Sequence, residues 1–155
     1  MSKSLQNAFQ IAQRYAIRPQ MCAVLYRKKK VYAIGISSVL YRKQTFNNKI
    51  YMPSVHAEID AVVKAYNNYV RIHKKPLYCD LVIARYIGCS KPCFNCLKIL
   101  QSSAFQIYIN KVSYMEDGKL KTEKLSNMST DHISRGYKYK TEHDKSWISS
   151  NIYLY

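Results

Sequence analysis

The spacing of hydrophobic and polar positions predicts an alternation of helices and strands. Apolar residues recur every three or four positions over 4–17, from about 56 to 70, and from 92 to about 104, which is the period of an amphipathic helix. Runs rich in apolar and β-branched residues predict strands over 20–27, 31–39, 78–86, 105–115 and 119–125. This order of elements favours an α/β fold of three layers.

The connections between these elements are predicted from polar and turn-forming residues. Lys28-Lys29-Lys30 separates the first two strands by a hairpin distance, and Asp117-Gly118 is a strong signal for a tight antiparallel hairpin between the last two. Residues 40–54 are predicted to form a polar loop, and 71–76 a basic connection. We expect a single domain over 1–155, with a core at about 4–125 and a C-terminal extension at 126–155.

Two short motifs carry the candidate chemistry, and each opens a predicted helix. The first is His56-Ala57-Glu58 and the second is Pro92-Cys93-Phe94-Asn95-Cys96. One imidazole and two thiolates can bind zinc and leave a fourth position open for water. Glu58, two residues after the histidine, can carry protons beside that water. Pro92 suits the opening of a helix, and a helix N-terminus favours the thiolate form of cysteine.

Other interpretations of these cysteines stay open at this point. A C-x-x-C pair also occurs in redox sites and in structural zinc sites. Cys89 can add a third thiolate to Cys93 and Cys96 and close the site. A complete but catalytically inactive site is a further alternative.

The two motifs together resemble those of the cytidine deaminase superfamily, in which H-x-E is followed by P-C-x-x-C. The resemblance implies a mixed five-stranded sheet with helices on both faces, and zinc bound by His56, Cys93 and Cys96. Glu58 then matches the proton carrier of a hydrolytic deamination. The N–H of Ala57 and the carbonyl of Lys91 match the groups that hold the base.

Two further features bear on the position of the chain within that superfamily. A hairpin at Asp117-Gly118 makes the last two strands antiparallel, which resembles the branch that acts mostly on cytosine. Many relatives carry Gly-x-Asn at the end of the second strand, where the asparagine binds the sugar. Here the matching run is Gly35-Ile36-Ser37, so Ser37, Asn47 or Asn48 is left to bind the sugar.

The charge of the chain points to a polyanionic partner. Lys and Arg number 25 against 9 Asp and Glu, for a formal net charge of +16, and such basic domains bind phosphate chains. We therefore expect cytosine in single-stranded DNA or RNA as the substrate, with Arg42, Lys43 and Lys49 near the pocket. The first alternative is a free cytidine, deoxycytidine or monophosphate deaminase. The second is an inactive, zinc-stabilised nucleic-acid-binding module.

Cysteine content and hydropathy indicate the compartment. The chain has five cysteines, an odd number, and Cys22 and Cys79 lie in apolar runs typical of buried free thiols. No apolar run has the length needed to span a bilayer, and the first residues lack the features of a signal peptide. We expect an intracellular, reducing compartment and no membrane partner. The resemblance also allows for homo-oligomers.

Overall fold

The largest sheet has five strands. The computed structural model describes residues 1–17, 20–39, 44–46, 49–51 and 54–132, and for residues 39, 44–46, 49–51, 54 and 104 it describes the backbone alone. In spatial order the strands are β2 (Lys30–Ile36), β1 (Met21–Arg27), β7 (Leu77–Arg85), β8 (Ile107–Glu116) and β9 (Lys119–Lys124). β7 and β8 are parallel, and all other neighbours are antiparallel. The mixed five-stranded sheet predicted from the sequence is confirmed.

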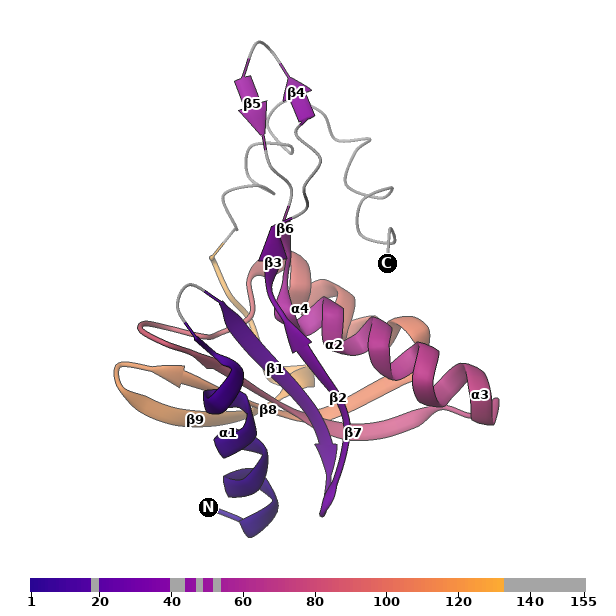
Figure 1. The fold of residues 1–155 in the computed structure, drawn as a ribbon. Coiled ribbons are helices and arrows are strands. Elements are labelled where there is room, and N and C mark those ends of the chain that lie inside the picture. Colours follow the sequence, from indigo (N-terminus) through magenta and orange to yellow (C-terminus); the bar gives the residue numbers. More distant parts are fainter. Residues whose placement is uncertain (18–19, 40–43, 47–48, 52–53, 133–155) are drawn as a thin grey trace.

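Helices cover both faces of this sheet (Figure 1). On one face, α1 (Lys3–Tyr15) buries Ala8 and Ala12 against β1 and β7. On the other face lie α2 (Ala57–Ala65) and α4 (Phe94–Gln101), which bury their apolar sides against β1, β7 and β8 in the larger core cluster. The result is the three-layer α/β architecture that the order of elements predicts.

The helix after His56 is longer than α2 alone. α2 continues into a π-helical turn, η1 (Tyr66–Val70), and then into α3 (Arg71–His73), where Lys74 ends it in a left-handed conformation with φ of 53°. Two short 3-10 turns complete the described helices, η2 (Ala104–Gln106) and η3 (Leu125–Asn127). Among the described residues, no helix has both the length and the hydropathy that a membrane crossing requires.

Gly35 allows α2 to lie close to β2. A Cβ atom at this position would lie 2.1 Å from the carbonyl oxygen of Ala57 and 2.3 Å from the backbone nitrogen of Ala61. No side chain fits at such distances. Because Ala57 is the first residue of α2, the glycine fixes the height of the helix start above the sheet.

Both predicted hairpins are present. β1 and β2 are joined at Lys28 and Lys29, with Lys28 at φ of 54°. β8 and β9 pair antiparallel about Asp117 and Gly118, whose φ values of 52° and 72° are those of a type I′ turn. The antiparallel pairing of the last two strands is therefore confirmed.

The prediction was wrong in part between residues 37 and 55. The predicted strand 31–39 is divided at Ser37, whose N–H donates to Met21 O at 3.0 Å and whose hydroxyl accepts from Met21 N–H at 2.8 Å. This closes the end of the main sheet, so the next residues pair elsewhere. Beyond it, β3 (Ser38–Val39), at the end of the predicted strand, pairs with β6 (Ser54–Val55). Within the predicted loop 40–54, β4 (Gln44–Phe46) pairs with β5 (Lys49–Tyr51). Four residues in this segment are of types that favour strands: Thr45, Phe46, Ile50 and Tyr51. Their polar neighbours led to the prediction of a loop.

The start of the second metal-site helix also differs from its prediction. α4 begins at Phe94, two residues after Pro92, and Cys93 is its N-cap in an extended conformation. The helix ends at Gln101 and not near Ala104, because Ser103 adopts a positive φ of 55°. Cys93 therefore lies at the junction of loop and helix, where a residue normally leaves helical geometry.

Candidate metal centre

The starts of two helices bring the three predicted metal ligands together. His56 is the N-cap of α2, Cys93 is the N-cap of α4, and Cys96 lies in the first turn of α4. The two helices pack through an apolar cluster in which Ile59 and Val63 of α2 meet Ile99 of α4. This packing holds the imidazole opposite the two thiols, although they are 37 and 40 residues apart in the chain.

The geometry of the three side chains fits a zinc ion. His56 Nδ1 lies 3.5 Å from Cys93 Sγ and 3.2 Å from Cys96 Sγ, and all three candidate ligand atoms are within 4.8 Å of one another. In a tetrahedral zinc site a nitrogen and a sulfur ligand are separated by about 3.6 Å. Within the described part of the chain, this is the one group of His, Cys, Asp or Glu side chains close enough to hold a metal ion.

The same three groups stabilise a thiolate through their mutual hydrogen bonds. The hydrogen bond from Cys96 and the one with His56 lower the pKa of Cys93 to about 4, against the opposing effect of burial. The pKa of Cys96 is raised well above its ordinary value, chiefly because its thiol makes that hydrogen bond to Cys93. The hydrogen bond with Cys93 also raises the pKa of His56, to about 9. A site that already favours a thiolate suits a cation.

Glu58 lies beside this cluster and is almost completely buried. It is the second residue of α2, its relative exposure is 2%, and it lines the same pocket as His56 and Cys93. Burial raises the pKa of its carboxyl, and the nearby His56 partly opposes this rise. A carboxyl group with a raised pKa can both accept and donate a proton near neutral pH.

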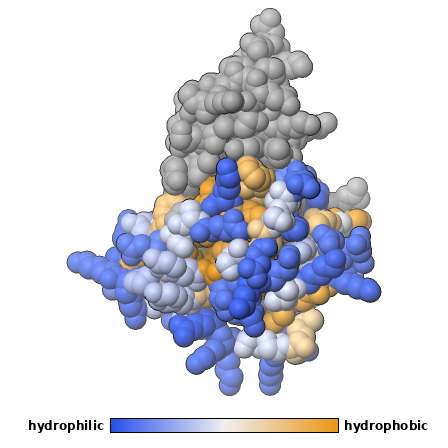
Figure 2. All heavy atoms as spheres, turned by 180° about the vertical axis from the view of Figure 1, so that it is seen from behind, coloured by the Kyte–Doolittle hydropathy of each residue, from blue (hydrophilic) through white to orange (hydrophobic). Residues whose placement is uncertain are grey.

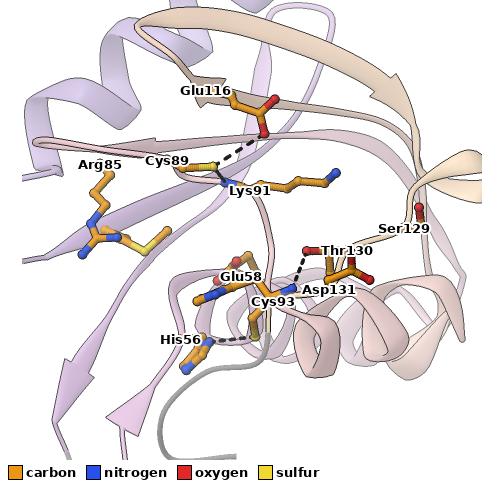
Figure 3. Close-up of a pocket in the computed structure, with 12 residues that line it drawn as sticks. His56, Glu58, Arg85, Cys89, Lys91, Cys93, Glu116, Ser129, Thr130 and Asp131 are labelled. Carbon is orange, nitrogen blue, oxygen red and sulfur yellow. Dashed lines mark hydrogen bonds between the residues drawn. The ribbon is translucent and has the colours of Figure 1, made fainter. Parts of the chain in front are cut away.

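The pocket in front of the cluster has a volume of about 620 Å³. Figure 3 shows His56, Glu58 and Cys93 on one side, with Cys89, Lys91 and Glu116 on the opposite side. Arg85, at the end of β7, and a short segment from Ser129 to His132 form further walls. Since both histidine and thiolate line this space, a metal ion bound there faces the pocket and is accessible to a small molecule.

The alternative of a closed site with Cys89 as a ligand is not supported by the geometry. The Cys89 thiol is exposed, accepts the N–H of Lys91 at 3.4 Å and donates towards Glu116 Oε2 at 3.9 Å. It therefore interacts across the pocket from the cluster (Figure 3).

The residues predicted to bind substrate have different positions. Lys91 lines the pocket. Ala57 is fully buried against Gly35, and the Ser37 hydroxyl is occupied by Met21 N–H, so neither is among the described residues that line the pocket. Arg42, Lys43, Asn47 and Asn48 lie outside the described residues, and only the backbone of Lys49, in β5, is described.

Several residues that line the pocket were not found from the sequence, namely Met21, Arg85, Glu116 and 129–132, and Cys89 was considered only as a metal ligand. The role of Arg85 could have been inferred, because it lies at the carboxyl end of a predicted strand, where ligands of α/β sheets bind. No sequence feature that we recognised indicates that residues 129–132 line the pocket. This segment is positioned by hydrogen bonds to backbone carbonyl groups in and before it: Phe94 N–H donates to His132 O at 2.8 Å, and the side-chain Nε2 of Gln101 donates to Leu125 O at 2.9 Å and to Met128 O at 3.0 Å.

No protein-family model matches this chain, and no curated protein matches it either. The chemistry of the site is therefore inferred from its own side chains.

Proposed function

We propose that this protein is a zinc-dependent hydrolytic deaminase that converts cytosine to uracil in single-stranded nucleic acid. The main support is the placement of a buried carboxyl group, Glu58, beside the His56, Cys93 and Cys96 cluster at the wall of an open pocket. A structural zinc site needs neither the carboxyl group nor the pocket.

The side chains divide the chemistry between them. His56, Cys93 and Cys96 would hold the zinc ion, which supplies an acidified water molecule at neutral pH when one coordination position is open. The Glu58 carboxylate accepts a proton from the attacking water and delivers it to the ring nitrogen of the base. It then takes the remaining proton of that water from the new hydroxyl group and transfers it to the departing amine as the carbon–nitrogen bond breaks, so that cytosine and water become uracil and ammonia.

The choice of cytosine is supported by the strand order. The antiparallel pairing of β8 and β9 is the feature by which the chain resembles the mostly cytosine-directed branch of the deaminase superfamily. The choice of a polymer is supported by the net charge of +16, which attracts polyphosphates. A base in a duplex must leave the stack to reach a buried site, so unpaired cytosine is the favoured form.

A free nucleotide is the second candidate substrate, and the pocket itself favours it. Its described lining has two cationic side chains, Arg85 and Lys91, together with the acidic Glu116 and Asp131. Two cations suit one phosphate better than an extended chain of phosphates.

A product screen tests the proposal directly. Purified zinc-loaded protein is incubated at low salt with cytidine, deoxycytidine, their monophosphates, and single-stranded DNA and RNA of mixed sequence, and uracil is measured by mass spectrometry. Uracil formed mainly in the polymers supports the proposal. Turnover of monomers alone moves the assignment to a nucleoside or nucleotide deaminase. Zinc binding without any turnover indicates an inactive zinc-stabilised module.

A further inference from the structure

Two basic segments meet at the end of the molecule that lies away from the pocket. One is the β1–β2 turn and the other joins α3 to β7. Lys30 Nζ lies 5.6 Å from the ring centroid of Tyr69, and Lys75 Nζ lies 5.7 Å from the same centroid. We call this surface the basic end, and its cationic residues are Lys28, Lys29, Lys30, Arg71, Lys74 and Lys75, all of them exposed.

Few acidic groups lie near the basic end, and Asp80, which lines a small pocket together with Lys28, is one of them. The chain has no Asp or Glu before Glu58 and none between Asp60 and Asp80. Among the residues whose side chains are described, the two ion pairs are Lys64–Asp60 and Lys121–Glu116, and neither includes a cation of the basic end. Six neighbouring positive charges repel one another, and a bound polyanion would relieve that repulsion.

Aromatic rings lie among and beside these cations. Lys30 Nζ is 4.9 Å from the ring centroid of Tyr32, which packs edge-on against Tyr69. Around the end of the sheet, on the face that α1 covers and opposite the face on which Tyr69 packs, Tyr78 of β7 is in register with Tyr108 of β8, and their rings stack at 5.1 Å with an interplanar angle of 18°. The two tyrosine residues are 55% and 42% exposed. In a stacked pair, each ring covers only one face of the other. The outer face of each tyrosine is therefore not covered by its partner ring.

The basic end is separate from the candidate metal centre. Met21 and Arg85 line the pocket and lie opposite each other in the β1–β7 register, whereas Arg27 and Leu77 are at the far ends of the same strands. Tyr78 is seven residues from Arg85, which is about 23 Å along a strand. In Figure 1 the β1–β2 turn is at the lower end of the sheet, and in Figure 2 hydrophilic side chains project from that end.

We propose that the basic end is a second contact surface for single-stranded nucleic acid, with its lysines on phosphates and Tyr78 and Tyr108 stacking on bases. The proposal rests on the proposed function for the kind of partner, but it concerns residues outside the pocket. Unpaired bases can stack on exposed rings, whereas the bases of a duplex already stack on one another. Lysine side chains and ring faces together distinguish this surface from one that binds only charge.

Binding to a thymidine oligonucleotide of about 30 residues tests this surface independently of turnover, because the strand contains no cytosine and its length exceeds the site sizes of about 4–16 nucleotides found in other single-strand binders. Fluorescence anisotropy of the labelled strand at several salt concentrations gives the affinity and its salt dependence. Removing two phosphate contacts should reduce the slope of log K against log salt by about 1.4.

The charge test compares two variants that lose the same number of positive charges. Lys29→Gln with Lys75→Gln removes two cations of the basic end, and Lys98→Gln with Lys119→Gln removes two cations elsewhere on the described surface. We expect the first pair to weaken binding and flatten the salt dependence, and the second pair to bind like the wild type. Equal effects of the two pairs would show that only net charge matters and would overturn the proposal.

The stacking test uses the tyrosine pair. Tyr78→Ala with Tyr108→Ala should weaken binding about tenfold or more, since stacking contributes about 1–3 kcal/mol per base. Tyr78→Phe with Tyr108→Phe keeps the rings and should retain the affinity, which controls for the substitutions themselves. Thermal melts of each variant check that the fold is intact. Wild-type affinity in the alanine pair would overturn the role of the rings.

Two further measurements separate this inference from its alternatives. Stronger lysine-dependent binding to phosphatidylserine vesicles than to the oligonucleotide would assign the surface to a membrane and overturn the proposal. Turnover of cytosine with unchanged strand binding in all basic-end variants would leave the deaminase assignment intact and remove this surface. Loss of strand binding in those variants, with no turnover of any cytosine substrate, would support the surface and refute the deaminase.

Discussion

At the scale of single residues, Glu58 is the side chain on which the proposed chemistry depends most. Burial raises the pKa of its carboxyl, while the imidazole of His56 nearby favours the ionised form. Glu58 is not part of the group of candidate metal ligands. In the proposed mechanism its role is to move protons, and the metal site should tolerate its replacement.

Glu58→Gln should retain zinc and fold and lose turnover. The amide has almost the same size as the carboxyl group but cannot exchange a proton in the same way, so we expect the rate of uracil formation to fall by at least about a hundredfold. Metal analysis and a thermal melt on the same preparation show whether the site survives. Activity near the wild-type level would mean that another group carries the protons.

Two cysteines near the candidate centre are expected to differ in their roles: Cys93 binds the metal ion and Cys89 does not. Cys93→Ser should lower the zinc content well below one ion per chain, because it removes one of three ligands. Cys89→Ser is the matched control, since Cys89 lies in the loop before the same helix but is not in the cluster. It should keep the full zinc content. Loss of zinc from Cys89→Ser, measured by plasma emission spectroscopy, would contradict the ligand assignment.

At the scale of elements, the position of α2 on the sheet determines the position of the candidate centre. The helix carries His56 at its N-cap and Glu58 in its first turn, and it approaches β2 closely at Gly35. Asp60 Oδ2 also accepts the N–H of Ile36 at 2.9 Å. These contacts fix the helix start to the end of β2, so a change in the strand moves the site.

Gly35→Ala should therefore affect both stability and metal binding. The added methyl group must displace the backbone of α2, which we expect to lower the free energy of unfolding by about 3 kcal/mol. Zinc affinity should fall as well, because His56 moves with the helix. Gly118→Ala is the control: nothing lies within 4 Å of its added Cβ, so only the strain of its φ of 72° remains, at about 1 kcal/mol. Chemical denaturation and zinc titration of both variants measure the two effects.

Local sequence patterns were sufficient for the main elements but not for the contacts between them. The periodic spacing of apolar residues around α2 and α4, and the Asp117-Gly118 turn, depend on neighbouring residues and were predicted correctly. The wall formed by residues 129–132 depends on a backbone hydrogen bond between Phe94 and His132. Almost every residue has the same backbone N–H and C=O groups, so the order of side chains does not predict a hydrogen bond between two of them. The Ser37 hydroxyl accepts the N–H of Met21, and local spacing does not reveal a pairing between residues so far apart in the chain either.

At the scale of the whole molecule, buried groups with raised pKa values predict sensitivity to alkaline conditions. Burial raises the pKa of Cys22 to about 11, and those of Tyr26 and Cys79 to about 12. The unfolded chain releases these protons at lower pH, near 9 for a cysteine. Between that pH and the folded values the unfolded state binds fewer protons, so stability falls as pH rises.

A variant of Cys22 isolates this effect from the titration of surface lysines. Cys22→Ala should destabilise the protein at pH 7.5, because it leaves a small cavity under α1. The difference in melting temperature between the variant and the wild type should then shrink at pH 10, where the wild type alone loses the contribution of the protonated thiol. A difference that stays constant from pH 7.5 to pH 10 would contradict the raised pKa.

The central place of β7 in the sheet has a consequence for synthesis of the chain on the ribosome. β1 pairs with β2, which follows it directly, but its other edge pairs with β7, which begins 50 residues after β1 ends. At elongation rates of about 5–20 residues per second, that edge waits on the order of 3–10 seconds for its partner. β1 is buried over Cys22–Tyr26 in the folded protein. An open, apolar strand edge readily pairs with other chains, so aggregation during synthesis is expected mainly in this interval, before β7 has emerged.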